Sequence, residues 1–177
     1  FKRHIDRLKL EISDKSMVVP NCQAARVFNE LMTRRGIPMK TANHGVDIGS
    51  DTTSAAARCT TKQGERIKSA ASKAKRVALL AKRNHRARRL AITGVKPAQD
   101  YGHTAVGMAP SRVKACKTNI AMATGMLSPG SCGTSIIKWA FRFGTYTHRS
   151  ADPRVAMPVA QVKAWTAIWR RASDATR

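Results

Sequence analysis

Acidic residues are scarce in this chain. Only 10 of its 177 residues are Asp or Glu, against 33 Lys and Arg, so the net charge is +23 and the isoelectric point lies near 11.3. This much positive charge repels itself in a compact fold, and a polyanionic partner is therefore expected. Nucleic acid is the first candidate and an anionic membrane surface the second, beside a solvated basic surface with no specific partner.

Aromatic residues and long apolar runs are also lacking. Aromatic residues make up 5% of the chain, whereas hydrophobic residues make up 42%, many of them Ala. This balance favours closely packed helices over a β-sandwich or barrel. No apolar run is long enough to cross a bilayer, and no signal-peptide pattern follows Phe1. We therefore expect an intracellular protein whose partner is nucleic acid and not a membrane. Because the sequence begins with Phe1 and not Met, we also expect it to be a fragment of a longer protein.

The chain contains no complete motif for catalysis or metal binding. A P-loop, a G-x-G-x-x-G segment and a Ser-His-Asp order are all missing. Asp47 and Asp51 could share a metal, but they flank Gly49, and a turn explains them better. The four cysteines form no C-x-x-C pair, and no two of them lie near a His at zinc-finger spacing: Cys22, Cys59, Cys116 and Cys132. A disulfide framework is not expected in so long a chain. The sequence thus predicts no metal site.

The first fifty residues alternate between strand-like and helix-like patterns. After a helix end at 1–10, segment 10–19 suggests two short strands around a turn. A helix is predicted over 22–35 with Gly36 as its stop. Two further short strands are expected between 37 and 49. Residues 1–52 are therefore expected to form one α+β segment.

The composition changes near residue 52. Residues 52–99 hold thirteen Lys and Arg and one acid, Glu65. One long helix is predicted from 61 to 92, ended by Gly94 and Pro97. Its apolar stripe consists of small and aliphatic residues: Ile67, Ala70, Ala74, Val77, Ala78 and Ala81. This helix opens a basic helical region over 53–150.

Shorter helices are expected after the basic one. A helix over 112–124 is capped by Ser111 and stopped by Gly125. Residues 136–143 are predicted to be helical and 144–154 to form a loop. A last amphipathic helix, in a C-terminal part 151–177, begins at Pro158 and carries large apolar residues on one side: Val162, Trp165, Ile168 and Trp169.

The charge pattern of the long helix predicts phosphate binding. Opposite charges three or four residues apart stabilise a helix, whereas like charges destabilise it. Here nearly all such pairs are like-signed, which is tolerable if phosphates neutralise them. The predicted nucleic-acid-binding residues are the cations of this helix: Lys62, Arg66, Lys68, Lys73, Lys75, Arg76, Lys82, Arg83, Arg86, Arg88 and Arg89.

Three short motifs, in order, resemble the end of a reverse transcriptase of the non-LTR retroelement type. "LEISDKS" (10–16) is similar to the family's L-x-(I/L)-N-x-x-K-T segment. Lys15 lies one residue closer to Ser13 than the family's spacing would place it. "HGVDIG" (44–49) is similar to its primer-gripping hairpin, although Asn43-His44 replaces the aromatic-Leu pair. Tyr101-Gly102 is similar to a pair in its helical thumb.

The resemblance implies a small palm-edge α+β segment followed by a basic, thumb-like helical bundle. It implies Lys15 as the one residue near catalysis, primer-grip-like roles for His44, Gly45 and Val46, and RNA or an RNA–DNA duplex as the partner. The family's metal-binding acids would precede Phe1, so this chain alone should not polymerise, and Mg²⁺ belongs only to the complete polymerase. A eukaryotic retroelement product would be nuclear. The alternative is a free-standing basic helical RNA-binding protein of the ribosome- or nucleoid-associated type.

Overall fold

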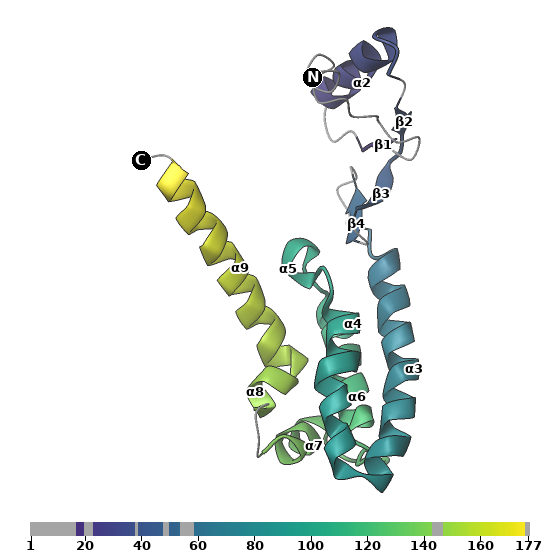
Figure 1. Ribbon diagram of the computed structural model, residues 1–177, viewed down its shortest axis with the longest axis vertical. Helices are drawn as coiled ribbons and strands as arrows, with labels where there is room; N and C mark the ends of the chain where they lie inside the picture. The colour runs from purple at the N-terminus through teal and green to yellow at the C-terminus, as the bar shows by residue number, and fades with distance from the viewer. Residues whose placement is uncertain are drawn as a thin grey trace. The chain divides into compact units, whose positions relative to one another are not determined.

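The computed structural model describes residues 17–19, 23–37, 39–47, 50–53, 59–142 and 147–175. The chain divides into two compact units, Phe1–Cys59 and Thr60–Arg177. The predicted α+β, mostly helical fold is confirmed: the strands lie in the first unit, and the second is helical (Figure 1). The predicted boundaries fall after residues 52 and 150, whereas the structure divides the chain after Cys59 and keeps the C-terminal helix in the second unit.

The first unit holds one helix and two small sheets. Helix α2 (Gln23–Arg34) joins strands β1 (Met17–Val18) and β2 (Lys40–Thr41), which pair in parallel. Parallel neighbours need such a crossover because a tight turn cannot join them. Strands β3 (His44–Asp47) and β4 (Ser50–Thr53) form an antiparallel hairpin.

The helix predicted over 22–35 is confirmed, and so is its stop. Gly36 has φ +76, and the Ile37 N–H closes the helix by donating to Met32 O at 3.0 Å. The strand expected at the end of 10–19 is β1, which pairs with β2, while residues 10–16 of that segment lie outside the described residues. The last predicted strand, expected to end at Gly49, is β3 and ends at Asp47, and the strand that pairs with it, β4, was not predicted.

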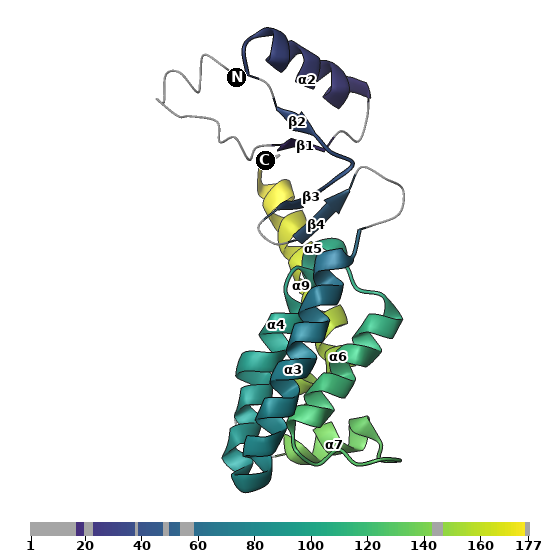
Figure 2. The ribbon, with the colours of Figure 1, turned by 90° about the vertical axis from the view of Figure 1, so that its right-hand side faces the viewer.

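The described residues of the second unit form helices and the segments that join them. Its helical elements, in chain order, are α3 (Thr61–Arg83), the 3₁₀ turn η1 (His85–Arg88), the π-helical turn η2 (Ala91–Val95), α4 (Lys96–Asp100), α5 (His103–Val106), α6 (Pro110–Ala123), α7 (Gly133–Ala140), α8 (His148–Ala151) and α9 (Pro153–Ala175). Figures 1 and 2 both place α3 beside α4 and α6, and these helices are in contact. None of the described helices is both long enough and apolar enough to cross a membrane.

Small side chains form the contact face of α3, as the apolar stripe predicts. Ala70 and Ala74 are fully buried and Ala81 nearly so, while Val77 packs at the edge of the core. Opposite them lie Ile120, Ala121 and Ala123 of α6 and residues of η2. Alanine adds little volume beyond the backbone, so the helices of this unit can approach closely.

The prediction of one helix from 61 to 92 is wrong. Helix α3 ends at Arg83, and Asn84 is extended, with φ −138 and ψ 110. The Asn84 side chain accepts a hydrogen bond from the Arg86 N–H at 3.0 Å, which starts a new helical segment. Residues 85–100 then run back along α3, through Gly94 and Pro97, instead of ending there. The basic sequence therefore forms a helical hairpin.

Buried amides connect three helices of the second unit. The Asn119 Nδ2 atom donates to Ile67 O on α3 at 3.2 Å and to Gln99 Oε1 on α4 at 3.1 Å. Gln99 Nε2 in turn donates to Cys116 O on α6 at 3.1 Å. A buried polar group without a partner would destabilise the fold, so these paired amides fix how α3, α4 and α6 meet.

The remaining helices correct several predicted boundaries. Helix α6 begins at Pro110 after Ala109, so Ser111 is not its cap, while its predicted stop is confirmed: Gly125 has φ +73. Helix α7 begins at Gly133, earlier than expected, and 148–151 is a helical turn within the predicted loop. The last helix begins at Pro153, and Pro158 lies inside it.

Helix α9 exposes its large apolar residues. Val162, Trp165, Ile168 and Trp169 are each 61–65% exposed. The side that meets the bundle carries Met157, which is buried, and the half-buried Ala160, Gln161 and Ala164. The helix thus packs with its smaller residues, and its apolar side faces solvent.

Candidate nucleic-acid interface

The second unit is far more basic than the first. Residues 60–177 contain 23 Lys and Arg and 4 Asp and Glu, which gives +19 of the total +23. Two of those acids, Asp100 and Asp152, are buried and serve the fold. Asp100 pairs with Lys96, and Asp152 Oδ1 accepts the Arg154 N–H at 3.0 Å at the start of α9. Among the described side chains of this unit, Glu65 is the one exposed carboxylate.

Three of the predicted cations are engaged within the fold. Lys62 Nζ lies 2.8 Å from Glu65 Oε2. The Arg66 guanidinium lies 4.3 Å from the centre of the Tyr101 ring, a cation–π contact that connects α3 to the turn after α4. Arg88 Nε donates to Thr124 O at 3.2 Å, at the end of α6. These three residues therefore have a structural role as well as a charge.

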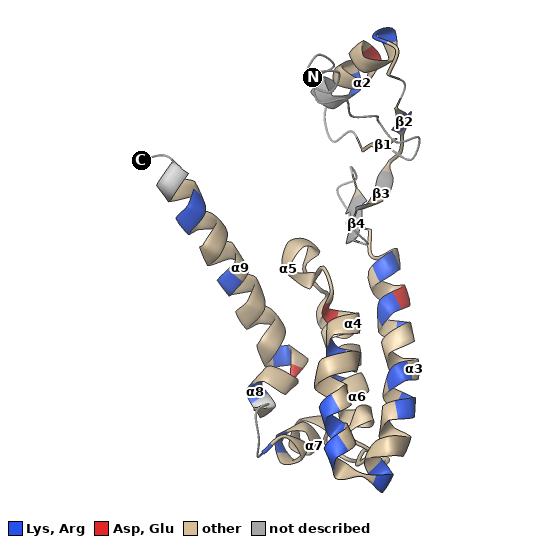
Figure 3. Ribbon diagram, in the orientation of Figure 1, with Lys and Arg blue, Asp and Glu red and all other residues tan. Residues whose placement is uncertain are grey.

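The other eight predicted cations are exposed. Within the described residues none of them makes a hydrogen bond or an ion pair through its side chain. They are Lys68, Lys73, Lys75, Arg76, Lys82, Arg83, Arg86 and Arg89. Figure 3 shows Lys and Arg along α3, with acid only near its start. Like charges this close raise the free energy of the folded state unless an anion neutralises them.

Lys68, Lys75 and Lys82 follow one line along α3. They are seven residues apart, which is nearly two helical turns and about 10.5 Å of helix rise. Lys75 and Lys82 border a hollow of about 580 Å³ between α3 and the segment that joins α6 to α7. Leu79 and Met122 line the same hollow, so the surface there is apolar between cationic edges.

The helical hairpin changes how the predicted cations are arranged. In one continuous helix, Arg86 and Arg89 would extend the line of Lys75 and Lys82. Instead the chain turns at Asn84, so that both arginines lie on the second arm of the hairpin, where η1 contacts α3. The cations therefore do not form the predicted single face of one helix. They form a basic surface to which both α3 and the turn at its end contribute.

The residues to which the resemblance gives a role near the primer lie in the first unit, whereas Tyr101 and Gly102 lie in the second. Lys15 lies outside the described residues. His44, Gly45 and Val46 form most of β3, and Gly45 is buried while Val46 is 44% exposed. The segment is a hairpin, as expected, and its register pairs Gly45 with Thr52. In the described residues no three His, Cys, Asp or Glu side chains gather as a metal site would require.

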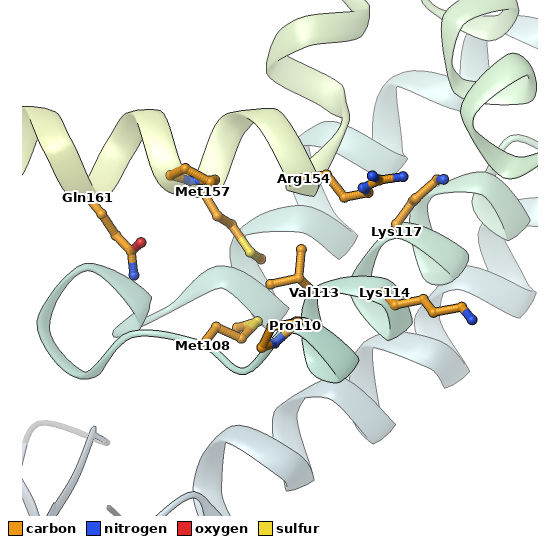
Figure 4. Close-up of a pocket in the computed structure, with 9 residues that line it drawn as sticks. Met108, Pro110, Val113, Lys114, Lys117, Arg154, Met157 and Gln161 are labelled. Carbon is orange, nitrogen blue, oxygen red and sulfur yellow. The ribbon is translucent and has the colours of Figure 1, made fainter.

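Sequence reasoning missed a second group of cations. Lys114 and Lys117 on α6 and Arg154 on α9 border another hollow, of about 510 Å³, where the start of α6 meets the start of α9 (Figure 4). The three-residue spacing of the lysines places both on one side of α6. Arg154 was not expected nearby, because the last helix is predicted to begin only at Pro158 and its packing on α6 is a tertiary feature.

Cys116 and Cys132 lie in different environments, which shift the pKa values of their thiols in opposite directions. Burial raises the pKa of Cys116 to about 12, and its Sγ lies 3.7 Å from Met108 Sδ. Cys132 is exposed at the start of α7, and hydrogen bonds from the backbone and side chain of Ser135 and the backbone of Thr134 lower its pKa to about 7. Only a thiolate is strongly nucleophilic, so Cys132 is the more reactive thiol near neutral pH.

Alkylation with iodoacetamide should therefore distinguish the two cysteines. The rate at Cys132 should rise with pH around a midpoint near 7, because a lowered pKa leaves the thiolate populated at lower pH. Cys116 should stay unmodified while the chain is folded. Peptide mass mapping across pH 5.5–9 gives both rates, and a Cys132→Ser variant identifies the fast site. A midpoint above pH 8 at Cys132 would contradict the geometry of its hydrogen bonds.

The sequence and structure were compared with known proteins, and these comparisons identify no relative of the chain. No protein-family model, no curated protein and no solved structure matches the chain.

Proposed function

We propose that the second unit binds nucleic acid through its phosphate backbone, with α3 and the turn after it as the contact surface. One observation carries this proposal: eight exposed cations have no partner in the described chain, while the one exposed carboxylate among the described side chains of this unit, Glu65, is paired with Lys62. The backbone of a nucleic acid carries a row of negatively charged phosphates, which can neutralise the row of cations formed by Lys68, Lys75 and Lys82. Contacts of this kind fix position on a duplex and carry no sequence information.

The partner proposed is an RNA duplex or an RNA–DNA duplex, held as a reverse-transcriptase thumb holds a template and primer. The order of elements supports this proposal, since a β hairpin at His44–Asp47 and Ser50–Thr53 is followed by a basic helical unit. Lys15 and the hairpin residues His44, Gly45 and Val46 would then lie near the primer end. A nuclear location would follow only from a eukaryotic retroelement origin.

A free-standing RNA-binding protein is the second candidate. The observation that favours it is the self-contained core of the second unit, in which α3, η2, α6 and α7 bury one another. Such a protein has no need of a primer terminus. The two candidates therefore differ in whether the end of the duplex affects binding.

A salt titration tests the shared part of both candidates. Affinity for a fluorescent RNA–DNA duplex should fall steeply between about 50 and 200 mM salt, because six to ten phosphate contacts lose roughly 10³–10⁵ in affinity over that range. Fluorescence anisotropy provides the measurement. A flat profile would contradict phosphate binding.

A comparison of duplex ends then separates the candidates. A thumb-like protein should prefer a duplex with a recessed 3′ end over a blunt one of equal length, and Val46→Asp should remove that preference. Equal affinity for both ends would favour the free-standing protein.

A further inference from the structure

The hollow between α6 and α9 has apolar walls. Met108, Pro110 and Val113 line one side and Met157 the other, around about 510 Å³ of space. This volume lies within the range of small-molecule sites. Methionine side chains adapt to the shape of what they contact, and Met108 is further positioned by the Cys116 thiol.

Cations gather at one end of this hollow. Figure 4 shows Lys114, Lys117 and Arg154 together, while Gln161 lies at the opposite end. Lys117 Nζ donates to Thr134 Oγ1, but the Lys114 and Arg154 side chains form no hydrogen bond or ion pair within the described residues. The hollow thus has an apolar body and a cationic end, and no carboxylate lines it.

The walls suit an aliphatic chain better than a nucleobase. A base presents several donors and acceptors at its edges, and each of them needs a partner when it is buried. Gln161 is the one amide in the lining, and its Nε2 atom already donates to His103 O at 3.0 Å. No aromatic ring lines the hollow to stack on a base. A hydrocarbon chain leaves no such group unpaired.

We propose that this hollow is a binding site for an amphipathic anion: an aliphatic chain in contact with Met108, Val113 and Met157, ending in a phosphate or carboxylate held by Lys114, Lys117 and Arg154. Two cations without other partners and an apolar volume beside them match the two ends of such a molecule. The site lies outside the α3 surface, so it is independent of the nucleic-acid proposal.

Dodecyl phosphate, kept below its micelle concentration, is the probe. With the full chain labelled at its methionine methyl groups, NMR should show concentration-dependent shifts at Met108 and Met157. Met17 and Met32, which lie in the first unit, are internal references and should not move. Dodecanol has the same chain without the charge and should bind at least about tenfold more weakly, because the charge-assisted contacts are lost. Shifts at all four methionines, or none, would overturn the proposal.

Paired variants test the cationic end. Lys114→Gln with Arg154→Gln should weaken dodecyl phosphate binding by about tenfold or more, while Lys138→Gln with Lys163→Gln, which removes the same charge elsewhere, should leave it unchanged. Equal loss in both pairs would refute a specific site.

Vesicles containing phosphatidic acid identify the source of the anionic group. If the first pair also abolishes binding to these vesicles, the natural ligand is a lipid with its headgroup; if vesicles are never bound, the ligand is a free acid or monoester. Loss of nucleic-acid binding in α3 variants should not affect this site.

Discussion

Replacing Lys75, Lys82, Arg86 and Arg89 together by Gln is expected to weaken nucleic-acid binding by roughly tenfold to a thousandfold at about 100 mM salt. Each phosphate contact contributes about 0.9 to the slope of log affinity against log salt, so four lost contacts should also make that slope shallower by about three to four. All four side chains are exposed, and none has a partner within the described residues. Fluorescence anisotropy across a salt series measures both quantities.

The same variant should remain folded. Each like-charged pair three or four residues apart destabilises a helix by a few tenths of a kcal/mol, roughly, so removing charges should hold or slightly raise the melting temperature. The matched control removes four exposed charges from other helices: Lys138, Lys163, Arg170 and Arg171 to Gln. If the control loses as much affinity as the first variant, net charge alone drives binding and the α3 surface is not the interface.

Ala74→Asp is expected to destabilise the second unit by roughly 3–5 kcal/mol. Ala74 is fully buried in the core where α3 packs on its neighbours, and an unpaired carboxylate there has neither water nor a counter-ion. The larger side chain must also displace packed atoms. Since domains are stable by only about 5–15 kcal/mol, the melting temperature should fall by more than about 10 °C in circular dichroism.

Ser72→Asp provides the control for this change. Ser72 is exposed on α3, with Lys68 four residues before it and Lys75 and Arg76 three and four residues after it. The same carboxylate should there form favourable helical pairs and leave the melting temperature unchanged or slightly higher. If both variants melt at the wild-type temperature, the alanine stripe of α3 is not a core face.

Sequence patterns predicted correctly those features of the fold that depend on residues close together in the sequence, such as the buried side of a helix and the position of its end. The alanine spacing of α3 predicts its buried side, because that pattern depends only on helical geometry. Gly36 and Gly125 predict helix ends, since a positive φ is needed there. At Gly125 a further restriction is tertiary: a Cβ atom would lie 2.9 Å from Ala78 O, so the end of α6 lies directly against the backbone of α3.

Features decided by tertiary contact escaped prediction. The reversal at Asn84 uses one side-chain hydrogen bond, and its benefit comes from the packing of 85–100 against α3, which no local pattern reveals. The cations around the α6–α9 hollow were missed for the same reason. The charge pattern treats the eleven predicted basic residues alike, yet three of them have partners in the fold: Glu65, Tyr101 and Thr124. Only Glu65 is close in sequence to its cation, and the other two partners are seen only in the structure.

The exposed apolar side of α9 has a consequence for how the protein behaves in solution. Val162, Trp165 and Trp169 form a surface that would attract a second copy, but each copy carries a net charge of +23. At about 0.01 M salt the repulsion between copies extends roughly 30 Å, whereas at 1 M it reaches only about 3 Å. Colloidal stability should therefore decrease as salt rises, until short-range attraction between tryptophan surfaces dominates. The protein is then best stored in dilute buffer, where its own charge keeps the copies apart.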